Sequence, residues 1–352
     1  MSLVTNPEEA RWIYQTAARR GVCLPNFCAE NIQTLEAILQ AAKEFSEEHK
    51  VKGLPVIIAF TANYHERQQL KLYTGLNNID EGFLAIRSDI VRLTRAGGPY
   101  EKLKVMVHLD HSHPVKDKEI IRKGQGFFSS VMYDCSYLPI EENMKRTADF
   151  VRKYKKVFVI EGVVDEIIES GKDKIKDKLT EPEEAGRYVE KTGVDLIVCN
   201  LGTEHRATLA DKKYNCERAR QISGKVGKIL VIHGTSSLKD SELVSFADDG
   251  IVKVNIWTKL EKTGGQAVAN EIVKHSCEIL SARPALSMLT ESHRRYEVWI
   301  PAVVNLIKNY LNIFGAKKYN ACCAERRKEF NTRSKAGKDK DRGSYERSSK
   351  LS

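Results

Sequence analysis

Eight short apolar runs rich in Val, Ile and Leu alternate with longer amphipathic stretches, and this alternation limits the fold more than any other feature. The runs span residues 22–27, 54–61, 103–110, 127–134, 156–164, 194–202, 228–234 and 250–256. β-Branched and apolar residues favour strands, and strands that alternate with helices build a parallel sheet. Eight such repeats within about 280 residues predict an α/β fold, the (β/α)8 TIM barrel, whose usual size is about 250 residues.

An open, doubly wound sheet is the alternative architecture. It usually has fewer strands and a glycine-rich turn after the first one. The turn that follows the first run, Cys28-Ala29-Glu30-Asn31, contains no glycine. The closed barrel is therefore favoured.

Helical patterns fill the spaces between the runs. Helices are expected over residues 34–47 and 141–153, as a pair within 62–96 broken by a turn at 74–78, and as closing helices over 258–280 and 294–314. Thr180 is expected to cap a further helix, because acidic residues and Pro182 follow it.

Composition indicates a cytoplasmic protein. No apolar stretch approaches the length of a membrane span, and the first residues lack the basic and then apolar layout of a signal peptide. The eight cysteines form no CxxC pair and no framework spacing, which favours reduced thiols.

The C-terminal segment carries most of the net charge. Residues 316–352 hold twelve Lys and Arg against five Asp and Glu, a balance of +7 within a total of +10. We expect a barrel domain over residues 1–315 and a basic, disordered tail over 316–352. A contact between the tail and nucleic acid is the alternative to a solvated tail, because phosphate attracts positive charge without a specific fold.

Polar residues gather where the predicted strands end. They are Thr61, Asp110, His111, Asp134, Glu161, His205, His233 and Asn255. The carboxyl ends of parallel strands form one rim, where barrel enzymes carry their sites. A single histidine at such a place is often only part of the scaffold. Three imidazoles and a carboxylate from different strands suit a divalent transition metal, above all zinc.

Five motifs in order resemble the class II, zinc-dependent ketose-bisphosphate aldolases, the family of fructose- and tagatose-bisphosphate aldolases. They are His108-Leu109-Asp110-His111; Ser130 to Ser136 with Pro139 and Glu141-Glu142-Asn143; Gly202-Thr203-Glu204-His205; His233-Gly234-Thr235-Ser236; and Lys253-Val254-Asn255-Ile256. The resemblance runs from about Val22 to Gly315 and leaves out the tail.

The resemblance implies a catalytic zinc held by His111, His205 and His233, with a second divalent or a monovalent cation as a further option. Asp110 would be the acid/base at the oxygen on the aldehyde side, and Glu161 would be a fourth metal-site residue. The implied reaction is reversible retro-aldol cleavage of a phosphorylated ketose through a zinc-stabilised enediolate. The family also implies a homo-oligomer, either a dimer or a tetramer.

Candidate substrate contacts fall on the rim of the barrel. They are Thr61, Asp134, Arg206, Gly234, Ser236, Asn255 and Thr258. Gly234 and Ser236 match positions that contact substrate phosphate, and Asp134 matches an acid beside an alternative metal position.

Departures from the family pattern concern mainly the substrate side. Arg206, Thr235 and Ser237 replace glycines, Trp257 replaces an acid, and the fifth strand offers one glutamate where the family has two. We therefore expect aldolase chemistry on a phosphorylated ketose and do not assign fructose 1,6-bisphosphate as the substrate. The proton-abstracting acid of the loop over residues 165–178 has three candidates, Asp165, Glu166 and Glu169.

Two further functions remain open at this stage. The missing glutamate and lost glycines would also fit a catalytically silent barrel that acts as a regulatory or assembly subunit. His113, two residues after His111, resembles the HxH pair of metal-dependent hydrolases, although those enzymes carry the pair on their first strand.

Overall fold

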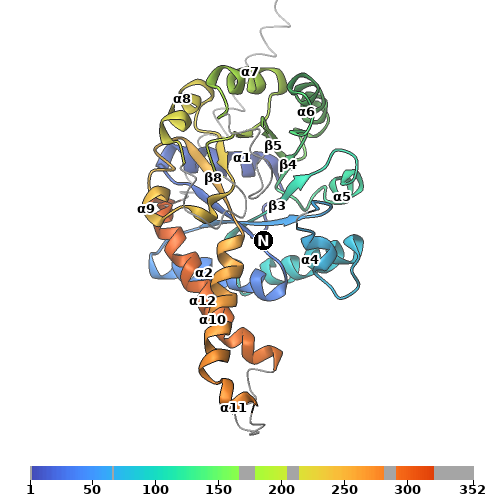
Figure 1. The fold of residues 1–352 in the computed structure, drawn as a ribbon. Coiled ribbons are helices and arrows are strands. Elements are labelled where there is room, and N and C mark those ends of the chain that lie inside the picture. The colour runs from blue at the N-terminus through green and yellow to red at the C-terminus, as the bar shows by residue number, and fades with distance from the viewer. Residues whose placement is uncertain (1, 66, 166–178, 204–213, 281–290, 321–352) are drawn as a thin grey trace, which may run out of the picture. The chain divides into compact units, whose positions relative to one another are not determined.

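The computed structural model describes residues 2–65, 67–165, 179–203, 214–280 and 291–320. Eight described strands pair in parallel in chain order, and the last returns to pair with the first, so that they form a closed barrel (Figure 1). The strands are β1 (Leu24–Cys28), β2 (Pro55–Thr61), β3 (Lys104–Ser112), β4 (Ser130–Tyr133), β5 (Val159–Val163), β6 (Leu196–Val198), β7 (Leu230–Ile232) and β8 (Ile251–Ile256). The predicted TIM barrel is confirmed.

Helices follow the strands and surround the barrel (Figure 1). They are α1 (Pro7–Arg20), α2 (Ile32–Glu48), α3 (Gln69–Leu72), α4 (Ile79–Thr94), α5 (Lys118–Lys123), α6 (Ile140–Tyr154), α7 (Pro182–Thr192), α8 (Cys216–Val226), α9 (Asp240–Leu243), α10 (Thr258–Lys274), α11 (Ser276–Leu280) and α12 (Ser292–Ile313), with 3-10 turns η2 (Thr235–Ser237) and η4 (Ala316–Lys318). The expected pair within 62–96 is α3 and α4, and the closing helices are α10 to α12.

Helix α1 precedes the first strand and was not expected, although the sequence carries its signals. The Asn6 side chain accepts hydrogen bonds from the backbone N–H groups of Glu8 and Glu9, and Pro7 occupies the first helical position. Gly21 ends the helix with φ +63°, a left-handed conformation that favours glycine.

The expectation that Thr180 caps α7 is wrong. The residue at the cap position is Glu181, and no side chain caps this helix end. The Thr180 hydroxyl instead donates to the Asp165 carboxylate and accepts a hydrogen bond from the backbone N–H of Asn200 at 2.7 Å. Competition from these tertiary partners explains the difference, because a hydroxyl near a helix start has several donors and acceptors within reach.

Side-chain alternation along the strands fills the barrel interior with polar groups. His108 and Asp110 of β3 both point inward, where they meet Lys253 and Asn255 of β8, while Leu109 between them faces the helices. The pairing of β2 with β3 continues to the rim of the barrel, where Thr61 of β2 lies opposite Asp110 of β3.

The packed part of the chain continues past the expected boundary at Gly315. Ala316 and Tyr319 are both buried. The basic segment from residue 321 onward, including most of the predicted tail, lies outside the described residues. None of the described helices is long and apolar enough to cross a bilayer.

Candidate active site

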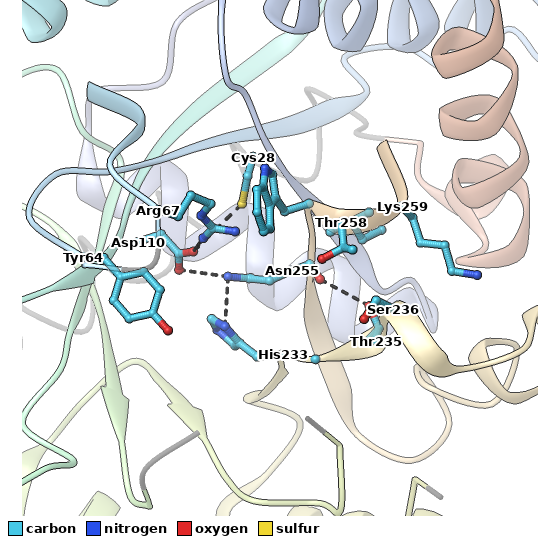
Figure 2. A pocket seen from close by; sticks show the side chains of 13 residues that line it. Cys28, Tyr64, Arg67, Asp110, His233, Thr235, Ser236, Asn255, Thr258 and Lys259 are labelled. Atoms are coloured by element: carbon cyan, nitrogen blue, oxygen red, sulfur yellow. Dashed lines mark hydrogen bonds and ion pairs between the residues drawn. The ribbon is translucent and has the colours of Figure 1, made fainter. Parts of the chain in front are cut away.

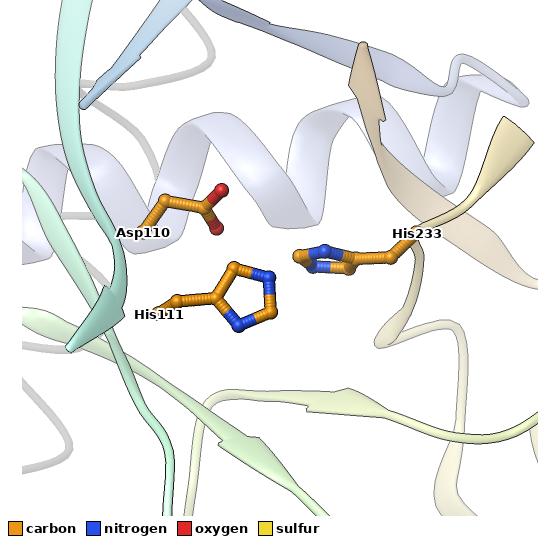
Figure 3. A group of neighbouring side chains, drawn as sticks. All are labelled: Asp110, His111 and His233. Carbon is orange, nitrogen blue, oxygen red and sulfur yellow. The ribbon is translucent and has the colours of Figure 1, made fainter. Parts of the chain in front are cut away.

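Three side chains from two strand ends meet at the barrel mouth (Figure 3). Asp110 and His111 lie on β3, and His233 directly follows β7. Each offers a carboxylate oxygen or an imidazole nitrogen, and these atoms lie within 4.8 Å of one another. All three side chains are buried. Side chains at the ends of β3 and β7 thus meet at the barrel mouth, as expected for parallel strands that end at one rim.

An irregularity in β3 lets two successive residues face the same space. In a regular strand, Asp110 and His111 would point to opposite sides of the sheet. His111 has φ +47°, and the register between β3 and β4 shifts between Leu109 and Ser112. A left-handed conformation at a residue with a Cβ is costly, and such backbone strain clusters at functional sites.

The His111 ring is held from two sides. Its Nδ1 lies 3.0 Å from Asp134 Oδ2, and the Tyr64 ring stacks on it with centroids 4.3 Å apart. Because a carboxylate can only accept, Nδ1 carries the proton and Nε2 carries the lone pair that a metal requires. Burial raises the pKa of the Asp134 carboxyl, but hydrogen bonds from His111 and Ser136 outweigh it and lower the pKa.

Asp134 was expected among the substrate contacts and beside an alternative metal position. In the structure one of its oxygens accepts from His111 and the other from the backbone and hydroxyl of Ser136, at 3.1 Å and 2.6 Å. Both oxygens of Asp134 are thus engaged by side chains and backbone of the barrel mouth, and its contact with substrate stays a prediction.

The His233 ring is oriented by Glu161 and Asn255. Its Nε2 lies 3.4 Å from Glu161 Oε1, and its Nδ1 lies 3.4 Å from Asn255 Nδ2. Burial lowers the pKa of His233 to about 3. The imidazole is therefore neutral at physiological pH, the state in which it binds metals.

Asp110 is the most heavily engaged carboxylate of the mouth. It accepts hydrogen bonds from Asn255 Nδ2 at 2.9 Å and from Arg67 Nη2 at 2.7 Å, and Cys28 Sγ lies at 3.9 Å (Figure 2). Burial raises the pKa of this carboxyl, but the three histidines around it and Arg67 hold the pKa well below its usual value. Asp110 is therefore ionised at neutral pH.

Glu161 faces the barrel interior, as the sequence analysis required, but its main partner was not anticipated. Lys253 Nζ donates to Glu161 Oε2 at 2.7 Å and to His108 Nε2 at 3.1 Å, and His108 Nδ1 lies 2.8 Å from Ser130 Oγ. All four side chains are fully buried. Burial raises the pKa of Glu161, yet Lys253 and the histidines bring it down to about 2.

Glu161 lies beside His233, and its place as a fourth metal-site residue stays a prediction. Its carboxylate is shared between Lys253 and His233, and it does not belong to the group of three that could hold an ion. We assign it the part of a support beneath His233, where it fixes the tautomer of the ring.

A pocket opens next to the cluster, with ≈ 500 Å³ of space that includes open solvent (Figure 2). Four expected substrate residues line it: Gly234, Ser236, Asn255 and Thr258. Thr61 does not, because its hydroxyl is turned to the backbone carbonyl of Arg67. His205, Arg206, Glu166 and Glu169 lie outside the described residues.

Sequence reasoning missed Tyr64 and Arg67, which follow β2 and reach into the mouth. Arg67 pairs with Asp110, and its guanidinium carbon lies 4.9 Å from the centroid of the Trp257 ring. The only sign of their role in the sequence is that an aromatic residue and an arginine follow the end of a strand. The segment that contains them has no periodic pattern that would predict where their side chains point.

The donor set fits a divalent metal. The imidazoles of His111 and His233 are ligands that zinc takes in catalytic sites, and the ionised carboxylate of Asp110 lies beside them. Each imidazole is also hydrogen bonded to a carboxylate at its other nitrogen, the arrangement that orients metal-binding histidines. Both the residue type and the hydrogen-bonded carboxylate beside each ring therefore make His111 and His233 candidate metal ligands.

Comparisons with known proteins identify the family of the chain. The family model described as class II fructose-bisphosphate aldolase matches residues 8–318. The chain is 30% identical over 253 residues to the D-tagatose-1,6-bisphosphate aldolase subunit GatY of Klebsiella oxytoca, covering 70% of this chain and 79% of the relative.

Solved structures agree on the fold. The fructose-bisphosphate aldolase of Campylobacter jejuni superposes with a TM-score of 0.71 at 19% identity, over 91% of this chain and 97% of that one. The YdjI aldolase of Escherichia coli K12 gives a TM-score of 0.60 at 21% identity, over 87% and 96%. Since the family model spans almost the whole barrel, this chain belongs to the class II fructose-bisphosphate aldolase family.

Proposed function

We propose that the protein is a metal-dependent aldolase that reversibly cleaves a C–C bond in a phosphorylated ketose. The observation that carries the proposal is the buried cluster of Asp110, His111 and His233 at the barrel mouth. Membership of the class II family supplies the reaction class. Zinc is the metal that this donor set suits best, and His205 is the third imidazole proposed to complete it.

Asp110 is proposed to move the proton at the oxygen on the aldehyde side of the cleaved bond. In the cleavage direction that oxygen must lose a proton, so the group beside it must act as a base. An ionised, buried carboxylate that lines the pocket meets this need. Asn255, which donates to Asp110, keeps the carboxylate directed toward the pocket.

A bound divalent metal would polarise the ketose carbonyl and offset the negative charge that develops as the bond breaks. The protein itself would hold the metal-binding side chains in fixed orientations. Asp134 and Tyr64 fix the His111 ring, and Glu161 fixes the His233 ring through Nε2, which leaves Nδ1 for the metal. Prearranged groups need no reorganisation when charge develops.

The phosphate end of the substrate is assigned to the turn after β7. Gly234 has φ +68° and leads into the short turn η2, so that successive backbone N–H groups and the Ser236 hydroxyl are presented at the pocket. Such concave sets of N–H groups bind anions. Lys259, at the start of α10, adds positive charge to the pocket lining.

The substrate is proposed to differ from fructose 1,6-bisphosphate. Trp257 lines the pocket where the family often has an acid, and it packs against Arg67. The relative GatY carries the name of a tagatose-1,6-bisphosphate aldolase, which places ketose bisphosphates of other stereochemistry among the first substrates to assay.

One assay separates an aldolase from a silent regulatory barrel. Zinc-loaded protein is incubated with a panel of ketose phosphates, and aldehyde release is followed beside an Asp110→Ala variant. We expect cleavage of at least one ketose phosphate and a loss of about 10²–10⁴-fold in the variant, the size of a general acid–base contribution. Zinc-loaded protein that cleaves none of the panel would reject the enzyme in favour of the silent barrel.

A further inference from the structure

Arg67 is a buried cation in the pocket that the proposed chemistry does not use. Its side chain is 10% exposed, and it lines the same pocket as Asp110 and Ser236. Nη2 donates to Asp110 at 2.7 Å, and the guanidinium lies over the Trp257 ring. An arginine brought this far from solvent is costly unless its charge has a partner.

The backbone around Arg67 is anchored, so the placement of the guanidinium does not depend on the side chain alone. The Arg67 carbonyl accepts from the Thr61 hydroxyl at the end of β2. Gln69 accepts from the Thr61 backbone N–H at 3.0 Å and donates to Glu30 at 2.9 Å. These bonds tie the segment after β2 to the ends of two strands and make Arg67 a fixed part of the mouth.

The guanidinium has donors to spare. It carries five N–H groups, and a bidentate acceptor would use two of them. Within the described residues, the buried Nε of Arg67 has no hydrogen-bond partner. The described pocket lining also holds two cations, Arg67 and Lys259, against one carboxylate, Asp110. The excess of positive charge in the lining favours an additional anion in the pocket.

Arg67 lies at the end of the pocket away from the proposed phosphate turn. Figure 2 shows Arg67 and Asp110 on one side of Asn255, and Thr235 and Ser236 on the other. A ketose whose phosphate occupies that turn would therefore direct the opposite end of the molecule, which leaves as the aldehyde, toward Arg67.

We propose that Arg67 selects substrates whose aldehyde half carries a carboxylate, so that the enzyme acts on a ketose phosphate that is also a sugar acid. This inference rests on the aldolase function proposed above. A planar carboxylate matches the fork of a guanidinium. A phosphate would place two charges beside the Asp110 carboxylate, whereas a carboxylate brings one.

Binding of small probes tests the proposal without turnover. Glycerate, glycerol and glycerol 3-phosphate share one carbon skeleton and differ in the end group. In titration calorimetry with zinc-loaded protein, we expect glycerate to bind at least about 10-fold more tightly than glycerol, and Arg67→Gln to remove this difference, as expected for a charged hydrogen bond. Lys259→Gln, which removes the other lining cation, should change glycerate binding less than about 2-fold. Tm measurements establish that each variant is folded.

The three alternatives each contradict the proposal. Equal binding of glycerate by wild type and Arg67→Gln would show that Arg67 does not meet the acid. Equal losses in Arg67→Gln and Lys259→Gln would indicate diffuse charge. A stronger dependence on Arg67 for glycerol 3-phosphate than for glycerate would identify phosphate as the anion.

Kinetics then separate recognition from an effect on Asp110. For an acid-bearing ketose phosphate, Arg67→Gln should raise KM at least about 10-fold, while the KM of the matched neutral ketose phosphate stays within about 2-fold. An equal loss of kcat for both substrates would mean that Arg67 only positions Asp110. If no ketose phosphate is cleaved at all, the aldolase function fails while the calorimetry still decides whether Arg67 binds a carboxylate.

Discussion

The two sides of the barrel mouth are built differently. On the histidine side, His111 and His233 are each hydrogen bonded to a carboxylate, and both histidines belong to motifs that resemble the family. On the arginine side, the Arg67 guanidinium lies over the Trp257 ring, and Trp257 stands where the family often has an acid. We therefore propose that the histidine side holds the metal and that the arginine side sets which substrate is accepted.

The largest effect should come from the histidine side. His111→Ala and His233→Ala each remove a proposed ligand, and we expect zinc content to fall from about one equivalent to a trace and kcat/KM to fall about 10³-fold or more, since a bound metal contributes several kcal/mol to catalysis. His293→Ala, an exposed histidine on α12, is the matched control. Full zinc content in both site variants would show that neither histidine binds the metal, and would contradict the distinction between the two sides.

The buried ion pair beneath the cluster should dominate stability. Lys253→Met leaves the Glu161 carboxylate without its cation, and we expect unfolding free energy to drop by about 3–5 kcal/mol. The double variant Lys253→Met/Glu161→Gln should recover most of the loss, as measured by urea denaturation. A single variant within about 0.5 kcal/mol of wild type would show that the pair is not needed.

The pH dependence of this pair follows from the pKa of Glu161. The folded pKa is about 2, below the ordinary value of 4.5, so the stabilisation is complete above pH 4.5 and is lost as the pH falls toward 2. His233 acts in the same direction, because its pKa falls from 6.5 to about 3 on burial and it resists protonation below pH 6.5. Stability measured from pH 7 to pH 3 should therefore decline.

A smaller effect is expected where a carboxylate acts through a ligand. Asp134→Asn keeps an acceptor for His111 Nδ1 but removes the negative charge, and we expect zinc affinity to weaken about 10–100-fold. Competition with a chelator measures this directly. Asp149→Asn, an exposed position on α6, serves as the control, and an equal affinity in both variants would reject the role given to Asp134.

The smallest effect lies near the arginine side, at Glu261 of α10. Burial, together with nearby Glu30, raises the pKa of Glu261 to about 7, and its buried Oε1 has no hydrogen-bond partner among the described residues. A raised pKa in an acid destabilises the folded state as pH rises above 4.5. Glu261→Gln should thus stabilise by about 1–2 kcal/mol at pH 8 and by almost nothing at pH 4. A gain that is independent of pH would contradict this origin.

Much of the histidine side could be predicted from the sequence. Parallel strands end at one rim, so Asp110 and His233, far apart in the chain, had to approach each other once the barrel was assigned. Alternation likewise placed Glu161 inside the barrel. Its partner Lys253 was not predicted, because no pattern in the sequence pairs these two residues, although Lys253 lies at an inward position of β8.

The arginine side could not be predicted in this way. The position of Arg67 depends on the hydrogen bond from the Thr61 hydroxyl to the Arg67 carbonyl, and Thr61 is held in turn by a bond from its N–H to Gln69. This segment has no periodicity. The turn of the His111 backbone to φ +47° also has no sequence signal, since nothing in His-Ser-His-Pro announces a left-handed residue within a strand. The regular strands of the barrel can thus be predicted from the sequence pattern. The irregular backbone at His111 and the segment around Arg67 cannot, because their conformations depend on residues that are distant in the chain.

A crystal of the zinc-loaded protein, measured at the zinc absorption edge, tests the central claim most directly. We expect one strong anomalous peak at the barrel mouth, about 2.0–2.1 Å from a ring nitrogen of both His111 and His233. A map with no peak between these two rings, obtained from protein that cleaves a ketose phosphate, would contradict the account.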